Sequence, residues 1–76
     1  MIMTTYRYGY YYAIIVLETG KCIEVRDTTN YYDPSEYPEY IPIPEPSMAY
    51  ILKYYNRADG KWYTDAQFTT LAEGLN

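Results

Sequence analysis

The chain has 76 residues, enough for one small domain, and its formal net charge is −4 at pH 7. An acidic surface disfavours binding to DNA, RNA and anionic membranes, because these partners attract cationic surfaces. The sequence has no histidine and one cysteine, which excludes an internal disulfide, a histidine-dependent catalytic triad and a zinc site built from these ligands. We therefore expect a protein that is not an enzyme and needs no cofactor or metal.

Tyrosine is the most unusual component, at 13 of the 76 residues. A phenol ring has a large apolar face and a polar tip, which suits half-exposed surfaces, and tyrosine is enriched where proteins bind one another. Pleated β-sheet faces also favour tyrosine without any binding function. Because the core of so short a chain is marginal, self-association is a simple source of additional stability.

Alternating residues predict a β-hairpin over residues 6–27. In its first strand one face carries four tyrosines, namely Tyr6, Tyr8, Tyr10 and Tyr12. The second half of that strand, up to Leu17, is apolar on both faces, which is typical of a central strand. Gly20 supplies the positive φ of a tight turn, and a second strand follows over residues 22–27 with Ile23 and Val25 on one side.

All five prolines lie between residues 28 and 46, in a segment that has no basic residue. Proline at this density excludes a helix or a central strand and favours an extended path. Because aromatic residues are interleaved with the prolines, we expect the segment to pack across the domain. Ile41 and Ile43 share one face and predict a short edge strand, where proline is tolerated.

Ser47 predicts the cap of a short helical turn over residues 48–52, and Asp59-Gly60 predicts the turn of a second hairpin over residues 53–64. The tail, residues 65–76, is either a frayed helix or an arm that orders on contact with a partner, and residues 1–5 are expected to be equally flexible. The predicted fold class is mostly β: a small antiparallel sheet of two hairpins, a Pro-rich crossing segment and one short helical turn, in a single domain of residues 1–76.

Other candidate sites have weaker support. Cys22 lies within a strand and reads as a structural thiol. Glu36 and Glu39 read as solvated carboxylates rather than an acid–base pair, since nothing nearby would bury one of them. The acidic stretch after Asp27 lacks the ligand spacing and the glycine of calcium-binding loops.

The second hairpin brings aromatic residues close to Lys53, Arg57 and Lys61. Such a group can stack on a sugar ring, which predicts a carbohydrate-binding module as one option. The simpler interpretation, which we favour, places Trp62 in the core. Across both hairpins, the residues predicted to form a protein interface are Tyr6, Tyr8, Tyr10, Tyr12, Tyr54, Tyr55, Trp62 and Tyr63.

Two resemblances are carried by specific segments. The run 59–63, DGKWY, is similar to the aromatic hairpin of choline- and glucan-binding repeats, although those proteins stack many hairpins and this chain has one. The segments YYYAII (10–15), CIEV (22–25), YIPIP (40–44), KYYN (53–56) and GKWY (60–63) follow an order that resembles small modules of phage and prophage tail-fibre or receptor-binding proteins of Gram-positive hosts. This second resemblance implies a short β-rich module of a virion, without catalytic residues. The chain departs from that pattern in its Tyr-rich N-terminus and its acidic insert at 28–39.

The function predicted from these features is a phage structural or attachment module that binds another virion protein or, by preference, itself. The alternative is a small acidic phage inhibitor of a host defence system, of the anti-CRISPR type, that blocks a nucleic-acid-binding surface. Its acidic patch would consist of Asp27, Asp33, Glu36, Glu39 and Glu45. No signal peptide is evident and the longest apolar run, 10–17, is too short to span a membrane, so we expect production in the host cytoplasm and, for a structural module, location in the virion.

Overall fold

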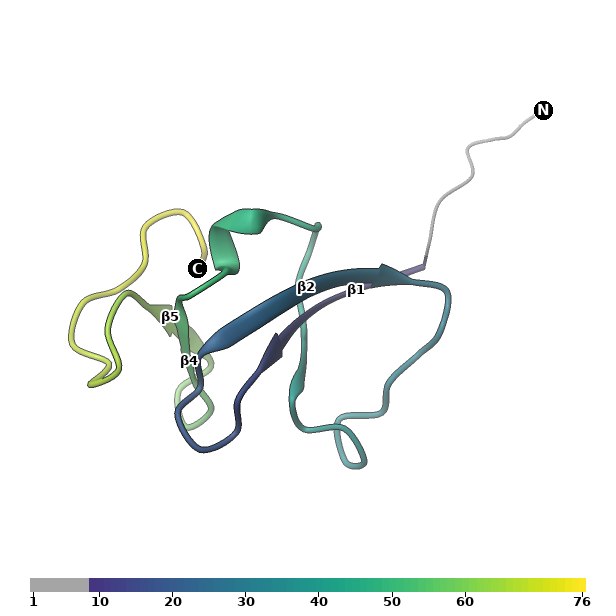
Figure 1. The fold of residues 1–76 in the computed structure, drawn as a ribbon, viewed down its shortest axis with the longest axis horizontal. Coiled ribbons are helices and arrows are strands. Elements are labelled where there is room, and N and C mark those ends of the chain that lie inside the picture. Colours follow the sequence, from purple (N-terminus) through teal and green to yellow (C-terminus); the bar gives the residue numbers. More distant parts are fainter. Residues whose placement is uncertain (1–8) are drawn as a thin grey trace.

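A computed structural model describes residues 9–76, and its central strand is β1 (Tyr10–Ile15). β1 lies between β2 (Cys22–Thr28) and β3 (Tyr40–Pro42) and is antiparallel to both (Figure 1). Ala13, Ile14 and Ile15 are all buried, because β1 has a strand on each side and packed chain on each face. This confirms the expectation of a central strand that is apolar on both faces.

The predicted first hairpin is present, with β1 and β2 joined through a turn in which Gly20 has φ +83°. Residues 6–8 of the predicted strand lie outside the described residues. One detail of the prediction is wrong: Ile23 and Val25 do not share a face. The ladder pairs Ile14 with Glu24 but Ile15 with Cys22, so Ile23 is the extra residue of a β-bulge and is exposed, while Cys22 points into the core.

The Pro-rich segment crosses the domain as expected. It leaves β2, folds over one face of the sheet and returns as the edge strand β3, which pairs with β1 through Ala13 opposite Ile41 (Figure 1). Ile41 and Ile43 are both 8% exposed. The ladder continues just past the strand, since the Ile43 N–H donates to the Tyr11 carbonyl at 3.0 Å.

The helical turn and the second hairpin also appear where the sequence placed them. Ser47 Oγ accepts a hydrogen bond from the Ala49 N–H at 3.2 Å and caps the 3-10 turn η1 (Met48–Tyr50). β4 (Tyr54–Asn56) then pairs with β5 (Lys61–Tyr63) as a separate two-stranded sheet. The mostly β fold class with antiparallel hairpins is confirmed.

The second hairpin is joined to the turn of the first by backbone hydrogen bonds. The Cys22 N–H donates to the Lys53 carbonyl, and the Tyr55 N–H donates to the Gly20 carbonyl, both at 2.8 Å. These bonds hold β4 next to the turn between β1 and β2, and Trp62 of the second hairpin packs in the same core as the three-stranded sheet. That core also contains Ala13, Ile15, Cys22, Ile41, Ile43, Tyr50 and Ala72.

The tail 65–76 contains no helix, so the helical option for this segment is wrong. It returns along β5, where Leu71 forms a single bridge with Tyr63 and Ala72 is 2% exposed. Asn76 then takes the place of a strand neighbour: its side chain accepts from the Trp62 N–H at 2.7 Å and donates to the Trp62 carbonyl at 3.0 Å. The apolar spacing of three and four therefore serves a looped segment that packs on its own domain.

Candidate functional site: a tyrosine cluster on the sheet

The face of the sheet opposite the main core carries six of the eleven tyrosines in residues 9–76. Residues of even number in β1 point to this face, and Ile14 stands opposite Tyr40 of β3. The Pro-rich loop between β2 and β3 supplies the remaining rings. The ring pairs connect six residues into one tyrosine cluster: Tyr10, Tyr12, Tyr31, Tyr32, Tyr37 and Tyr40.

The rings of the tyrosine cluster are arranged in favourable orientations. Tyr32 and Tyr40 stack with ring centroids 4.1 Å apart and planes 16° from parallel. Tyr12 meets each of them edge-on at 5.5 Å. Aromatic pairs of this kind contribute about 0.5–1.5 kcal/mol each beyond the area that they bury. The loop is therefore held on the sheet mainly through its aromatic side chains.

Polar contacts fix the base of the tyrosine cluster. The Tyr12 hydroxyl accepts a hydrogen bond from the Tyr32 N–H at 3.0 Å. On β2, Arg26 donates to the Tyr40 hydroxyl at 3.1 Å and to the Glu24 carboxylate at 2.7 Å. The bond with Glu24 raises the pKa of Arg26, and burial raises the pKa of Tyr40.

Exposure increases from the base of the cluster to its rim. Tyr12 is 2% exposed, whereas Tyr10 and Tyr37 are each 39% and Tyr31 is 60% exposed. A cleft of about 310 Å³ runs beside Tyr10 and Tyr31 and is completed by Pro42 and Pro44. A buried base with an exposed aromatic rim and a proline-lined cleft has the composition of a protein-binding surface.

The predicted interface residues are placed in four different environments. Tyr10 lies on the rim of the cluster, and Tyr12 is at its buried base. Tyr54, Tyr55 and Tyr63 are half-buried on the second hairpin, away from the cluster, and Trp62 is 4% exposed in the core. Tyr6 and Tyr8 lie outside the described residues.

Four members of the cluster were not among the predicted interface residues: Tyr31, Tyr32, Tyr37 and Tyr40. The interleaving of tyrosine with proline indicates that their segment packs on the domain. It does not indicate which face of the sheet the segment covers, because that depends on the path of the loop.

The aromatic residues of the second hairpin do not form a flat platform for a sugar. Neighbouring residues of a strand point to opposite faces, so Trp62 packs on Tyr50 and Tyr55 in the core while Tyr63 packs on Phe68 of the tail. The Tyr63 hydroxyl donates to Asp59, which raises the pKa of Tyr63 and lowers that of Asp59. The core position of Trp62 agrees with the simpler interpretation of this hairpin.

The predicted acidic residues lie on several elements. Asp33 and Glu36 share one turn of the Pro-rich loop, closed by the Glu36 N–H donating to the Asp33 carbonyl at 2.9 Å. Asp27 is on β2, and Glu39 precedes β3. Glu45 lies beyond the other end of β3, and its charge adds to burial in raising the pKa of Tyr50.

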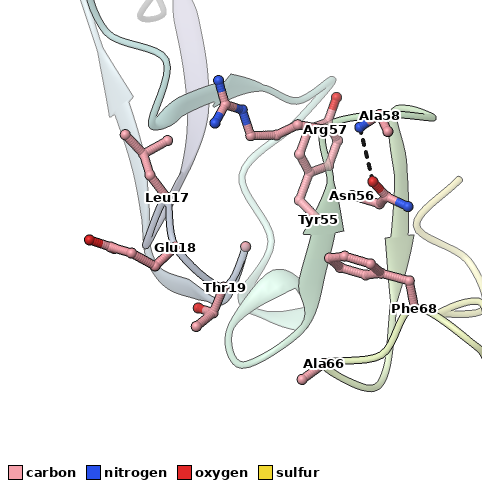
Figure 2. Close-up of a pocket in the computed structure, with 10 residues that line it drawn as sticks. Leu17, Glu18, Thr19, Tyr55, Asn56, Arg57, Ala58, Ala66 and Phe68 are labelled. Atoms are coloured by element: carbon pink, nitrogen blue, oxygen red, sulfur yellow. Dashed lines mark hydrogen bonds between the residues drawn. The ribbon is translucent and has the colours of Figure 1, made fainter.

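A second concavity, of about 340 Å³, lies between the turn of the first hairpin, β4 and the tail. Figure 2 shows Tyr55 and Phe68 at its centre, with the carboxylate of Glu18 pointing away from the other lining residues. The hydrogen bond in this view, from the Ala58 N–H to the Asn56 side chain at 2.9 Å, shapes the β4–β5 turn. This concavity contains contacts that support the turns rather than a set of converging polar groups.

Within residues 9–76, no group of three or more acidic or cysteine side chains is placed to hold a metal ion. Cys22 is fully buried, and burial raises the pKa of its thiol, which lowers its reactivity. Among the same residues no helix is long and apolar enough to cross a membrane. Comparisons with protein-family models, with curated proteins and with solved structures find no match for this chain.

Proposed function

We propose that this chain is a non-catalytic module of a phage particle that acts by binding proteins, including further copies of itself, through the rim of the tyrosine cluster. The observation that carries the proposal is the exposure of Tyr10, Tyr31 and Tyr37 around a base that is already packed. The fold keeps the base rigid through Tyr12 and Tyr40, so binding a partner at the rim requires little further ordering. The resemblance to phage tail-fibre modules supplies the virion context.

The rim is also the part of the cluster that the fold needs least. Tyr31 contacts the cluster through Tyr10 alone, at a centroid distance of 5.4 Å, and 60% of its surface faces solvent. An exposed ring of this size beside a proline-lined cleft is typical of a residue that becomes buried on binding. Tyrosine at the centre of an interface often contributes a large share of the binding energy.

The inhibitor alternative depends on a continuous acidic face. Asp27, Asp33 and Glu45 lie on β2, in the Pro-rich loop and after β3, and no feature of the described residues specifically favours such a face. Binding through the tyrosine rim is therefore the function that the geometry supports best.

The test is the rim substitution Tyr31→Ala, which removes one ring pair, compared with Met48→Ala. Met48 is 75% exposed on η1 and provides a matched loss of exposed apolar surface away from the cluster. We expect the rim variant to weaken assembly by about tenfold or more while its unfolding free energy falls by about 1 kcal/mol. Sedimentation velocity over a range of concentrations measures the first, and urea unfolding measures the second.

Equal effects of the rim variant and Met48→Ala on assembly would overturn the proposal. The virion context has a separate test, since mass spectrometry of purified particles of the encoding phage should detect the chain. Its absence from particles, with the rim still active in binding, would leave a protein-binding module outside the virion.

A further inference from the structure

The two edges of the three-stranded sheet differ in their ability to accept another strand. The ladder between β1 and β3 uses residues of odd number in β3, as the bond from the Ile15 N–H to the Glu39 carbonyl shows, so residues of even number point outward. At these positions Tyr40 already donates its N–H to the Tyr37 carbonyl, and Pro42 and Pro44 have no N–H. The β3 edge is therefore closed to strand addition.

The β2 edge is open over part of its length. Because residues of odd number in β1 bond to β3, those of even number bond to β2. Val25 and Asp27 stand opposite odd residues of β1, so their backbone N–H and C=O groups point outward. Among residues 9–76 neither backbone has a hydrogen-bond partner on this outer side. At the other end of β2 the outward groups of Cys22 bond to Leu52 and Lys53, so the open edge runs from Ile23 to Asp27.

We propose that two copies of this chain pair antiparallel through their β2 edges, with Val25 opposite Val25 of the second copy. This inference rests on the proposed self-association and adds a second contact to it, separate from the tyrosine rim. The occupant is a second copy because the charges of the edge are self-complementary. Glu24 and Arg26 lie two residues apart with opposite signs, and both side chains are half-exposed, at 48% and 40%.

Only three symmetric registers let the outward groups of Val25 and Asp27 bond to one another, and charge selects among them. Centring on Arg26 places two guanidinium groups opposite each other, and centring on Asp27 does the same with two carboxylates. Centring on Val25 places Glu24 opposite Arg26 twice, at pairs that are not hydrogen-bonded and whose side chains lie closest. Opposite charges at such pairs stabilise a ladder and like charges destabilise it.

The pairing has a consequence for the proposed binding surface. A two-fold axis through the Val25 pair stands perpendicular to the sheet, so the same face of each copy lies on the same side of a six-stranded sheet. Glu24 and Arg26 are on the face of the tyrosine cluster, where Arg26 contacts Tyr40. The dimer would therefore present two tyrosine rims side by side, which strengthens binding to a repeated partner.

A charge exchange tests the register. In Glu24→Lys the edge carries two positive residues and in Arg26→Glu two negative ones, so each variant should dimerise about tenfold more weakly than the natural chain. An equimolar mixture of the two should form a heterodimer, and the double variant Glu24→Arg with Arg26→Glu should restore the homodimer. Sedimentation velocity with one partner fluorescently labelled follows each species.

Val25→Pro tests the edge itself, since its N–H points outward and the fold does not use it. We expect this variant to keep its circular dichroism spectrum and to lose the dimer. Failure of the mixture to form a heterodimer, or a natural chain that stays monomeric at every concentration, overturns the inference. If Val25→Pro folds and dimerises while the rim variant does not assemble, the β2 contact is wrong and the tyrosine rim stands. If instead the rim variant assembles and Val25→Pro folds without dimerising, the β2 contact is retained and binding through the rim is wrong.

Discussion

The Tyr12 hydroxyl accepts a hydrogen bond from the backbone N–H of Tyr32 at 3.0 Å, and this bond ties the Pro-rich loop to the central strand. Tyr12 is 2% exposed, so its hydroxyl has no alternative partner in bulk water. The loop carries three members of the tyrosine cluster, namely Tyr31, Tyr32 and Tyr37. One buried phenol on β1 therefore controls where three further rings lie.

Tyr12→Phe should loosen the loop while keeping the ring contacts. The substitution leaves the Tyr32 N–H without its acceptor, which costs about 1–2 kcal/mol when the donor is partly buried. Urea unfolding should show this loss, and hydrogen exchange should accelerate at Tyr32. Tyr10→Phe is the matched control, because Tyr10 is on the rim and its hydroxyl makes no hydrogen bond within residues 9–76. Equal stability of the two variants would contradict the role assigned to the Tyr12 hydroxyl.

Gly20→Ala should destabilise the joint between the hairpins. A Cβ at this position would lie next to the Tyr55 carbonyl oxygen, far inside contact distance, and the φ of +83° is unfavourable for alanine. We expect a loss of about 2–4 kcal/mol, measured by thermal and urea unfolding. Gly74→Ala separates the two causes, because Gly74 has φ +82° with no atom within 4 Å of its Cβ position. That control should lose only about 1 kcal/mol, and a similar loss in both would exclude the contact with Tyr55.

Leu52→Gly should stabilise the protein. Leu52 has φ +68°, a conformation that costs a non-glycine residue about 1–2 kcal/mol, and it is 59% exposed, so little buried surface is lost. After the larger entropy of glycine in the unfolded chain is subtracted, a gain of about 0.5–1 kcal/mol remains. Leu17→Gly, at an exposed leucine with ordinary φ, should instead lower the unfolding free energy. A loss in both variants would show that Leu52 stabilises the fold through its side chain.

Asn76→Ala should release the tail from β5. The Asn76 side chain bonds to both backbone groups of Trp62 and also donates to the Ala72 carbonyl at 3.2 Å. Losing these bonds should cost about 1–3 kcal/mol and expose Trp62 to water, seen as a shift of tryptophan fluorescence to longer wavelength. Glu73→Ala, at an exposed residue of the same segment, should leave fluorescence and stability unchanged.

Acid should remove the contribution that the Asp65 carboxylate makes to the stability of the tail. The Asp65 carboxylate accepts hydrogen bonds from the Thr69 hydroxyl and from the N–H groups of Thr69 and Thr70, and these lower its pKa below the ordinary value of 3.8. The folded state therefore binds this proton less tightly than the unfolded state. The contribution of Asp65 to the unfolding free energy is complete above pH 3.8 and is lost as the pH falls through the lower pKa of the folded state.

The measurement is the urea midpoint between pH 5 and pH 2.5. Asp65→Asn should be less stable than the natural chain at pH 5 and should converge with it at the acid end. Glu73→Gln, at an exposed residue of the same segment, is the control for the loss of one negative charge. Parallel curves for Asp65→Asn and the natural chain would contradict the prediction.

The local structure can be predicted from the sequence alone, because it depends on interactions between residues that are near neighbours in the chain. The glycines at 20 and 60, the Ser47 cap and the alternation in residues 10–15 predict the turns, the 3-10 turn and the central strand where the structure has them. The dense prolines likewise predict an extended edge segment around Ile41. In each case one residue type restricts φ or offers a local hydrogen bond, so no distant contact is needed.

The membership of the tyrosine cluster depends on the tertiary structure and could not be predicted from the sequence. The bulge at Ile23 exchanges the faces of Ile23 and Cys22, and alternation alone does not reveal a residue inserted into a ladder. The tail forms a loop rather than a helix because Asn76 and Ala72 bond to Trp62 of β5, which lies 14 and 10 residues away in sequence. Tyr31, Tyr32 and Tyr37 reach the sheet through a long loop, and its closure depends on contacts with Tyr12 that no local pattern encodes.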